Sequence, residues 1–331
     1  ELFFSGKTNV NWDAVVQKPG QATRAASATV LAELAKQVEN MVVSSADLSN
    51  SDKTDGFLKN TKAFTKDDFS GAFLQAGVAE LTMACVCIGM SLHGGVIPAC
   101  ATFFVFSDYM KPAVRMAALM ELPVKFIWTH DAFRVGEDGP THQPIENTAG
   151  LRYIPNMDVW RPGSSTETAV AWVAAVERKN GPSSLVLSRQ NVAGIKHDAA
   201  QFDLMRKGGY VFSDVAGKAD VIIIANGSEL DLAVKAAAEL NAAGTKVRVV
   251  SMPSTNVFDR QDKAYKDSVL TPGVKRVAVE AAHSDFWRKY VGLEGAVVGI
   301  DTFGESAPGG VLLKHFGFTV ENVVATVKSV L

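Results

Sequence analysis

The sequence predicts an α/β protein of two domains, each a mostly parallel sheet covered by helices. Short apolar runs of β type alternate with segments of helical apolar spacing, which is the pattern of parallel sheets with helices on both faces. The chain has 331 residues, more than the roughly 250–300 at which a single hydrophobic core stops growing. A polar, glycine-containing stretch interrupts the alternation. We therefore expect a first domain at 15–195, a linker at 196–217 and a second domain at 218–331.

The first domain begins with a helix and a short strand. Apolar residues at helical spacing predict a helix at 22–38, and the next apolar run predicts a strand at 41–44. A long apolar segment at 78–92 is expected to be a helix that ends at Gly94-Gly95, since glycine commonly terminates helices. The same patterns predict the rest of this domain: strands at 124–129, 158–160 and 185–187 and a helix at 166–177.

The second domain starts with the apolar run 221–225, which predicts a buried strand. A helix at 230–243 and a strand at 246–250 are expected to follow. Two further strands are predicted at 276–280 and 296–300, before a loop rich in glycine and proline. The chain contains no internal repeat or low-complexity tract.

The nearly balanced charge of the chain disfavours partners that bind mainly through electrostatic attraction to a large net charge. Lys and Arg number 33 against 35 Asp and Glu, so electrostatics alone would not attract nucleic acid or an anionic membrane. No segment has the ~18 uncharged apolar residues of a membrane span, and residues 1–13 show no leader pattern. The cysteines Cys85, Cys87 and Cys100 are odd in number and lie among apolar residues. They indicate reduced thiols and a cytoplasmic location.

Several familiar catalytic motifs are missing. The run GESAPG at 304–309 is not a nucleophile elbow, because Pro308 stands two residues after Ser306 where the motif needs glycine. No G-x-G-x-x-G follows a strand, and no phosphate loop, C-x-x-C or H-E-x-x-H is present. Serine hydrolase, nucleotide and zinc chemistry are therefore disfavoured.

Glu80 is an isolated carboxylate at the start of an apolar helix. Within 71–101 the only acidic or basic residues are Glu80 and His93. An ionised carboxylate in an apolar setting is costly, so we expect Glu80 to be protonated or bound to a specific partner. The alternative, which the spacing alone favours, is a first-turn glutamate that faces water and is stabilised by the helix dipole.

A polar loop directly follows the predicted strand 124–129. It contains His130 and His142 together with three carboxylates, and glycines and prolines punctuate it. Because open α/β sheets bind ligands at the carboxyl ends of their strands, the loop is a candidate site. The D-x-[DN]-x-[DN]-G spacing of a calcium loop is missing. A polar surface loop is the remaining alternative.

A series of motifs in one order along nearly the whole chain resembles the transketolase family. They are TRAAS at 23–27, SADL at 45–48, GVAE at 77–80, LHGG at 92–95, the residues 102–109 around Phe103, Phe106 and Tyr109, ALM at 118–120, GEDGPTHQP at 136–144, LSRQN at 187–191 and IDTFG at 300–304. The motif at 136–144 is especially specific, whereas GVAE is shared with other thiamine diphosphate enzymes. The resemblance implies the second half of a transketolase, with a pyrimidine-binding domain followed by the family's C-terminal domain.

The resemblance also implies the cofactor thiamine diphosphate and residues that bind it. Glu80 would act as a catalytic residue by hydrogen-bonding a ring nitrogen of the aminopyrimidine, and a carboxyl group in an apolar helix suits that proton traffic. Phe103, Phe106 and Tyr109 would line the aminopyrimidine pocket, because flat rings pack against a flat heterocycle. An ordinary core role stays open for at least one of these three. Asp47 would lie near the cofactor across a dimer interface, or else cap a turn.

A sugar-phosphate site follows from the same resemblance. The implied reaction is reversible transfer of a two-carbon ketol unit from a ketose phosphate to an aldose phosphate, in the pentose phosphate pathway. His130, Asp138 and His142 would face the sugar, and His142 would assist proton transfer at the carbonyl. The terminal phosphate would be bound by Arg24, Ser51, His130 and Arg189. Arginine suits this role because its planar fork pairs with phosphate oxygens, and an ordinary helix-surface arginine is the alternative for Arg24.

The chain departs from the family pattern at two places and lacks one part of it. Ala79 stands where many relatives have arginine, and Ala-Phe-Arg at 132–134 stands where they have Ser-Ile-Gly, which makes Arg134 a further basic candidate. No Gly-Asp-Gly segment is present, although the family uses one to bind the cofactor's diphosphate through Mg²⁺ or Ca²⁺. The family's N-terminal sugar-site histidines are missing too.

We therefore expect a separate N-terminal half or subunit to bind the diphosphate and the metal. The assembly would be a homodimer or an α2β2 complex with active sites at the interface. A first residue Glu1, rather than methionine, favours a fragment of a longer chain over a natural small subunit.

Other thiamine diphosphate enzymes are rival interpretations. The beta subunit of a 2-oxoacid dehydrogenase is disfavoured by the loop 136–144 and by the phosphate arginines, since 2-oxoacids carry no terminal phosphate. Deoxyxylulose-phosphate synthase and dihydroxyacetone synthase are harder to separate from the sequence. An idle regulatory subunit is disfavoured because Glu80, the two imidazoles and both phosphate arginines are all present.

Overall fold

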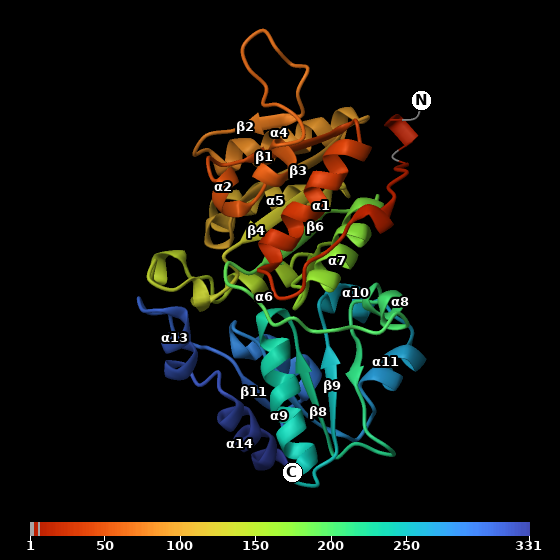
Figure 1. The fold of residues 1–331 in the computed structure, drawn as a ribbon, viewed down its shortest axis with the longest axis vertical. Helices are drawn as coiled ribbons and strands as arrows, with labels where there is room; N and C mark the ends of the chain where they lie inside the picture. The colour runs from red at the N-terminus through yellow and green to blue at the C-terminus, as the bar shows by residue number, and fades with distance from the viewer. Residues whose placement is uncertain (1–2, 6) are drawn as a thin grey trace.

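Two α/β domains lie one above the other along the long axis of the molecule (Figure 1). The computed structural model describes residues 3–5 and 7–331. Each domain is built on one sheet with helices on both faces, so the predicted fold class is confirmed.

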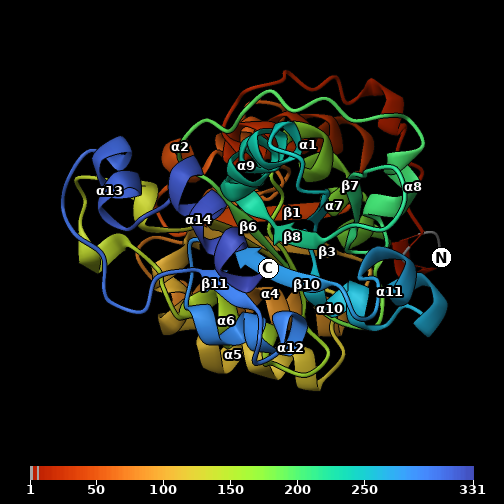
Figure 2. The same cartoon turned by 90° about the horizontal axis from the view of Figure 1, so that it is seen from below.

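The first sheet has six strands, all parallel, in the order β2-β1-β3-β4-β6-β5. The strands are β1 (Met41–Ser45), β2 (Phe73–Gln75), β3 (Ile97–Phe103), β4 (Lys125–Thr129), β5 (Asp158–Trp160) and β6 (Ser183–Leu187). The helices are α1 (Thr23–Gln37), α2 (Ser49–Asp52), α3 (Asp55–Leu58), α4 (Glu80–His93), α5 (Ser107–Leu119), α6 (Asn147–Arg152) and α7 (Ser165–Glu177). Helices α1 and α7 cover one face of the sheet, and α4 and α5 cover the other (Figure 2).

The second sheet has five strands in the order β11-β10-β8-β9-β7, and only β7 is antiparallel to its neighbour. The strands are β7 (Tyr210–Ser213), β8 (Val221–Ala225), β9 (Val247–Ser251), β10 (Lys275–Val279) and β11 (Ala296–Val298). The helices are α8 (Gln201–Met205), α9 (Leu230–Ala242), α10 (Thr255–Asp259), α11 (Lys263–Val269), α12 (Arg288–Val291), α13 (Gly309–His315) and α14 (Val320–Val330). Short 3₁₀ helices occupy Phe3–Ser5, Trp12–Ala14, Phe104–Phe106, Phe133–Val135, Pro140–His142, Gly227–Glu229 and Ser284–Trp287.

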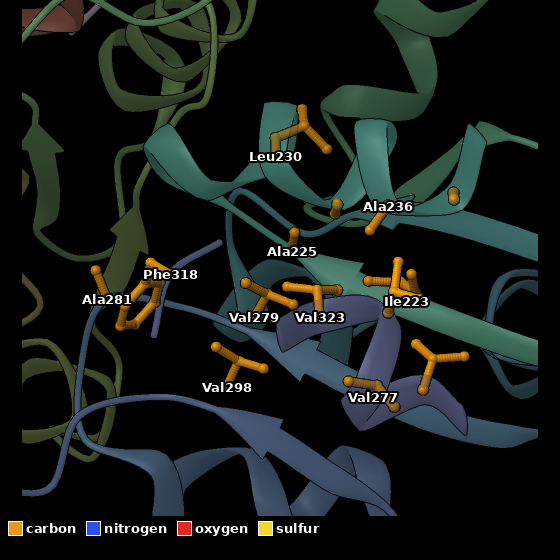
Figure 3. Packing of buried hydrophobic residues seen from close by; sticks show 14 of the residues in the cluster. Ile223, Ala225, Leu230, Ala236, Val277, Val279, Ala281, Val298, Phe318 and Val323 are labelled. Carbon is orange, nitrogen blue, oxygen red and sulfur yellow. The ribbon is translucent and has the colours of Figure 1, made fainter. Parts of the chain in front are cut away.

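The core of the second domain reaches into the loop that follows β4. Figure 3 shows its centre, where Ile223 and Val277 from the strands pack against Ala236 and Val323 from α9 and α14. The same cluster includes Phe133 from the first domain, whose ring lies 5.0 Å from the rings of both Phe316 and Phe318. The candidate loop is therefore anchored in the neighbouring core.

Five buried charged side chains join the two domains. Arg152 donates two hydrogen bonds of 2.7 Å to Glu280, and Arg161 pairs with Asp131, Glu229 and Glu280. Burial alone would raise the pKa of Glu280, but Arg152 and Arg161 hold it below its usual value. Burial raises the pKa of Asp131, against the opposing effect of Arg161. Because Asp131 follows His130 directly, this interdomain cluster also fixes the start of the candidate loop.

Most predicted elements are present, with their ends displaced by a few residues. The segment 196–217, for which the sequence predicts a linker, contains α8 and the edge strand β7. All three cysteines are free, as predicted, with Cys85 exposed and Cys87 and Cys100 buried. Among the described residues no helix is long and apolar enough to span a bilayer.

Candidate active site

The predicted site residues gather at one edge of the first sheet. Its strands are all parallel, so their carboxyl ends lie together at this edge, where α/β sheets place their ligands. Phe103 is the last residue of β3, His130 follows β4 and Arg189 stands two residues after β6. Asp47 follows β1 in the same way. Parallel topology thus brings together residues that are far apart in the sequence.

A buried aspartate shapes the turn after β1. Asp52 accepts hydrogen bonds from the Ser45 hydroxyl at 2.6 Å and from the Thr54 amide and hydroxyl at 2.9 and 2.7 Å. Burial raises the pKa of Asp52 to about 6, while these hydrogen bonds oppose the shift. The neighbouring Ser51 carbonyl accepts a 2.6 Å hydrogen bond from Arg24 Nη1. Arg24 and Ser51, both predicted phosphate ligands, are therefore in contact.

Arg24 and Arg189 form a cationic pair with no carboxylate bound to either. The pKa of Arg24 is lowered first by burial and then by the charge of Arg189, while Asp52 acts in the opposite direction. Arg189 Nη1 donates to the carbonyl of Val135 at 3.3 Å. Neither guanidinium forms an ion pair within residues 3–5 and 7–331. Two unpaired arginines side by side favour binding of an anion, and of phosphate in particular.

His130 lies beside this pair in a left-handed backbone conformation, with φ of 65°. Its Nδ1 lies 2.9 Å from the Thr129 hydroxyl, and the Phe103 ring lies 3.7 Å from its own ring. Burial, followed by the charges of Arg24, Arg189 and His142, lowers the pKa of His130 to about 3. At neutral pH His130 is a neutral imidazole, which can donate one hydrogen bond and accept another.

His130 should therefore stay neutral on acidification from pH 8 to pH 5. Its pKa in the folded state lies below the usual value near 6.5, so its contribution to stability is complete above pH 6.5 and is lost as the pH falls toward 3. The measurement is an NMR titration of the chain labelled at histidine, with the His130 signal assigned from His130→Gln. A His130 midpoint near 6.5 would contradict the geometry.

Three aromatic side chains extend from His130 toward the molecular surface. The ring centroids of Phe103 and Phe106 are 6.0 Å apart, and those of Phe106 and Tyr109 are also 6.0 Å apart. His142 stands edge-on to both phenylalanines, at 6.4 and 5.4 Å. Phe103 is buried, Phe106 is half-buried and Tyr109 is 64% exposed. The three rings are therefore not one closed core, and the outer two present flat faces that a heterocycle can cover.

The second domain braces the loop 136–144. Gln143 is buried and donates 2.9 Å hydrogen bonds to the carbonyls of Gly136 and Glu305, and Ser306 donates to the carbonyl of Glu137 at 2.6 Å. A Cβ atom on Gly304 would lie 1.7 Å from Gln143 Oε1, so the close approach of the two loops requires glycine there.

Three predicted residues lie at the open side of this edge. Asp47 and Asp138 are exposed, and neither side chain forms a hydrogen bond or an ion pair within the described part of the chain. Asp47 has φ of 62° and does not cap α2. Glu80 is half-buried in the first turn of α4, and α4 packs against α5, which starts beside Phe106. These side chains are available to a ligand or to another chain.

The residues present fit the aminopyrimidine end of the implied cofactor. Half-buried Phe106, exposed Tyr109 and a first-turn carboxyl group at the same sheet edge match the flat, hydrogen-bonding aminopyrimidine. Among the residues that the structure describes, no group of three or more His, Cys, Asp or Glu side chains could hold a metal ion.

Two family models match the chain, one in each domain. The model described as the transketolase pyrimidine-binding domain matches residues 20–194, and the transketolase-like C-terminal domain matches residues 208–319. Transketolase 2 of Aliivibrio fischeri is 49% identical over 94% of this chain and 47% of its own length. The chain spans about half the length of the curated relatives it matches.

Solved structures of transketolases also match nearly the whole chain. The transketolase of Pichia stipitis in complex with sedoheptulose-7-phosphate is 37% identical, with a TM-score of 0.92 over 98% of this chain and 49% of its own. A split-gene transketolase described as an inactive beta4 tetramer is 29% identical, with a TM-score of 0.73. That match covers 94% of this chain and 98% of the split-gene chain.

Proposed function

This chain belongs to the transketolase family, and we propose that it supplies one half of a thiamine diphosphate-dependent ketol-transfer site. The observation that carries the proposal is the clustering of Arg24, Arg189 and neutral His130 beside an aromatic row at one strand edge. In our proposal the pyrimidine-binding domain covers 15–195 and the C-terminal domain covers 218–331, to which the edge strand β7 at 210–213 adds.

Phe103, Phe106 and Tyr109 would hold the aminopyrimidine of thiamine diphosphate. The cofactor supplies, when bound, the nucleophilic carbon that accepts the ketol unit. Glu80 would hold a proton at a ring nitrogen of the aminopyrimidine, and Asp47 would contact the cofactor from across an interface. Half-burial and the start of an apolar helix favour a specific partner for Glu80, because an unpaired carboxylate is costly in such a place.

The substrates would be sugar phosphates. Arg24, Arg189, Ser51 and His130 would bind the terminal phosphate. Neither arginine has a carboxylate partner among residues 3–5 and 7–331, which supports this role. His142 and Asp138 would hydrogen-bond sugar hydroxyls, and His142 would move a proton at the carbonyl. The Pichia stipitis relative in complex with sedoheptulose-7-phosphate supports a phosphorylated ketose as substrate class.

A second half would complete the site by binding the diphosphate through Mg²⁺ or Ca²⁺. The outer faces of α4 and α5 expose Leu81, Val86, Leu92, Met116 and Leu119, a cluster of large apolar side chains that indicates an interface. We propose that this face packs on an N-terminal half, in a homodimer or an α2β2 assembly. Three free cysteines are consistent with a cytoplasmic location.

The test is reconstitution. The purified chain with thiamine diphosphate and Mg²⁺ should show no turnover of xylulose 5-phosphate with ribose 5-phosphate, and addition of the N-terminal half should restore it. The inactive split-gene relative supports this expectation. The control is the N-terminal half alone. Appreciable activity of the 331-residue chain by itself would disprove the proposal that the N-terminal half is required. A reconstituted complex without activity would disprove the proposed ketol transfer.

A further inference from the structure

A cavity of 590 Å³ lies in the second domain against the loop that follows β4, and it lacks the residues assigned above to the sugar-phosphate site. Helices α9, α13 and α14 surround it (Figure 1). Its apolar wall consists of Val192, Leu232, Leu313, Phe318 and Val320. It also borders the segment between β8 and α9, where the chain order of the second sheet reverses, since β9 lies on one side of β8 and β10 on the other. Open α/β sheets bind ligands at such switch points.

Arg134 places a positive charge on this cavity wall, and that charge also acts on the buried Asp131, where it opposes the rise in pKa that burial causes. The Arg134 side chain forms no hydrogen bond or ion pair within the described residues, and its Nε atom is buried without an acceptor. The Nε atom of Arg134 is one of several buried side-chain polar atoms without a partner among the described residues, and an acceptor on a ligand or a bound water would satisfy it. The sequence marked Arg134 as a basic candidate, and the structure shows that it borders this cavity. It is absent from the charges that lower the pKa of His130.

The acidic residues around the cavity are already engaged. Glu229 pairs with Arg161, and Asp231 pairs with Lys235 at 2.6 Å. The pKa of Glu321 is lowered by hydrogen bonds within the first turn of α14 and by the charge of Lys314. Lys314 forms no ion pair in the described chain, but its charge acts on Glu321. The cavity therefore joins an apolar wall to the guanidinium of Arg134, which forms no ion pair among the described residues.

We propose that this cavity is a second ligand site, which takes a small amphipathic anion. The ligand class is a carboxylate, phosphate or sulfonate group attached to an apolar ring or branched chain. The volume is in the usual range for small-molecule sites, and an apolar body distinguishes the ligand from a sugar phosphate. A ligand here would contact Arg134 and Asn191, which follow His130 and Arg189 closely in the chain.

The test uses 8-anilinonaphthalene-1-sulfonate as the probe and N-phenyl-1-naphthylamine as its uncharged counterpart. Fluorescence titrations compare the 331-residue chain with Arg134→Gln, Arg189→Gln and Gly310→Trp. Gly310 lines the cavity, and a Cβ atom there meets open space, so tryptophan can fill the cavity without a backbone clash. The Arg189→Gln variant separates this site from the sugar-phosphate site.

Arg134→Gln should weaken sulfonate binding about tenfold and abolish the preference for the charged probe. Gly310→Trp should weaken both probes, and Arg189→Gln should change neither. Circular dichroism confirms the fold of each variant, and Gly310→Trp alone decides the outcome if Arg134→Gln does not fold. Equal affinity of all variants for the sulfonate would overturn the proposal. So would loss of binding only in Arg189→Gln, which would place the probe in the sugar-phosphate site. Neither result would bear on ketol transfer, so the two proposals fail separately.

Discussion

Replacement of Glu80 with glutamine should slow exchange of the cofactor's thiazolium C2 proton by about a hundredfold or more in the reconstituted complex, the usual scale of acid–base catalysis. Glutamine keeps the shape of the side chain and one hydrogen bond but removes the acidic proton. Exchange of this proton precedes any step with the sugar. The exchange rate therefore reports the role of Glu80 separately from the sugar contacts of Arg24, His130 and His142. The rates are compared by NMR in deuterium oxide at matched cofactor saturation.

A first-turn glutamate in a merely structural role would behave differently. Its interaction with the helix dipole is worth roughly 0.3–1 kcal/mol, which leaves the exchange rate nearly unchanged. Glu321→Gln is the matched control, because Glu321 also lies in the first turn of a helix. An exchange rate in Glu80→Gln equal to that of the control would remove Glu80 from the catalytic role.

Strands with continuous apolar sequence could be predicted, and strands made of small or mixed residues could not. The run at β8 has Val221 and three isoleucines, which fit a strand buried on both faces. Strand β3 is equally buried but contains Pro98, alanines and Cys100, and its pattern does not differ from that of the apolar helix before it. Strand β7 escaped prediction because it is a short edge strand within a polar segment.

The apolar residues of helix α4 correctly predict a helix, but only some of them are buried in the core. Met83, Ala84, Cys87 and Ile88 face the sheet, whereas Leu81, Val86 and Leu92 are exposed. A sequence that is apolar on all sides indicates a buried helix. In the isolated chain the outer face of α4 is open, which agrees with a partner that covers it.

Site residues that lie in local sequence motifs could be predicted. Residues that act through contacts between distant parts of the chain could not. His142 and Arg189 lie in motifs of adjacent residues, and His130 lies in the polar loop after a predicted strand. The structure brings all three to one edge. The supporting contacts of Gln143 cannot be found this way, since its partner Glu305 is 162 residues away. Asp52 has a local signal in the sequence, since an aspartate two residues before a threonine can form a side-chain turn.

Arg161 is the residue whose loss should cost the fold most. It is fully buried and is the only cation paired with Asp131 and Glu229 among the described residues. Arg161→Met would keep most of the side-chain volume but leave these carboxylates without compensation. Removal of one member of a buried ion pair typically costs about 3–5 kcal/mol, and we expect a loss of free energy of unfolding of about this size.

Urea denaturation followed by circular dichroism measures this loss, and Arg206→Met is the control. Arg206 pairs with Glu177 at the surface, where such pairs contribute about 0–1 kcal/mol. The deficit of Arg161→Met should shrink as the pH falls from 7 to 5. Burial raises the folded pKa of Asp131, and loss of the opposing charge of Arg161 raises it further above the unfolded value, so protonation at lower pH stabilises the variant. Arg161→Lys restores a charge and should recover part of the loss. Similar small losses in Arg161→Met and Arg206→Met would show that the interdomain charges do not hold the domains together. The loop that starts at His130 and Asp131 would then depend on the packing of Phe133 and on the hydrogen bonds of Gln143 and Ser306.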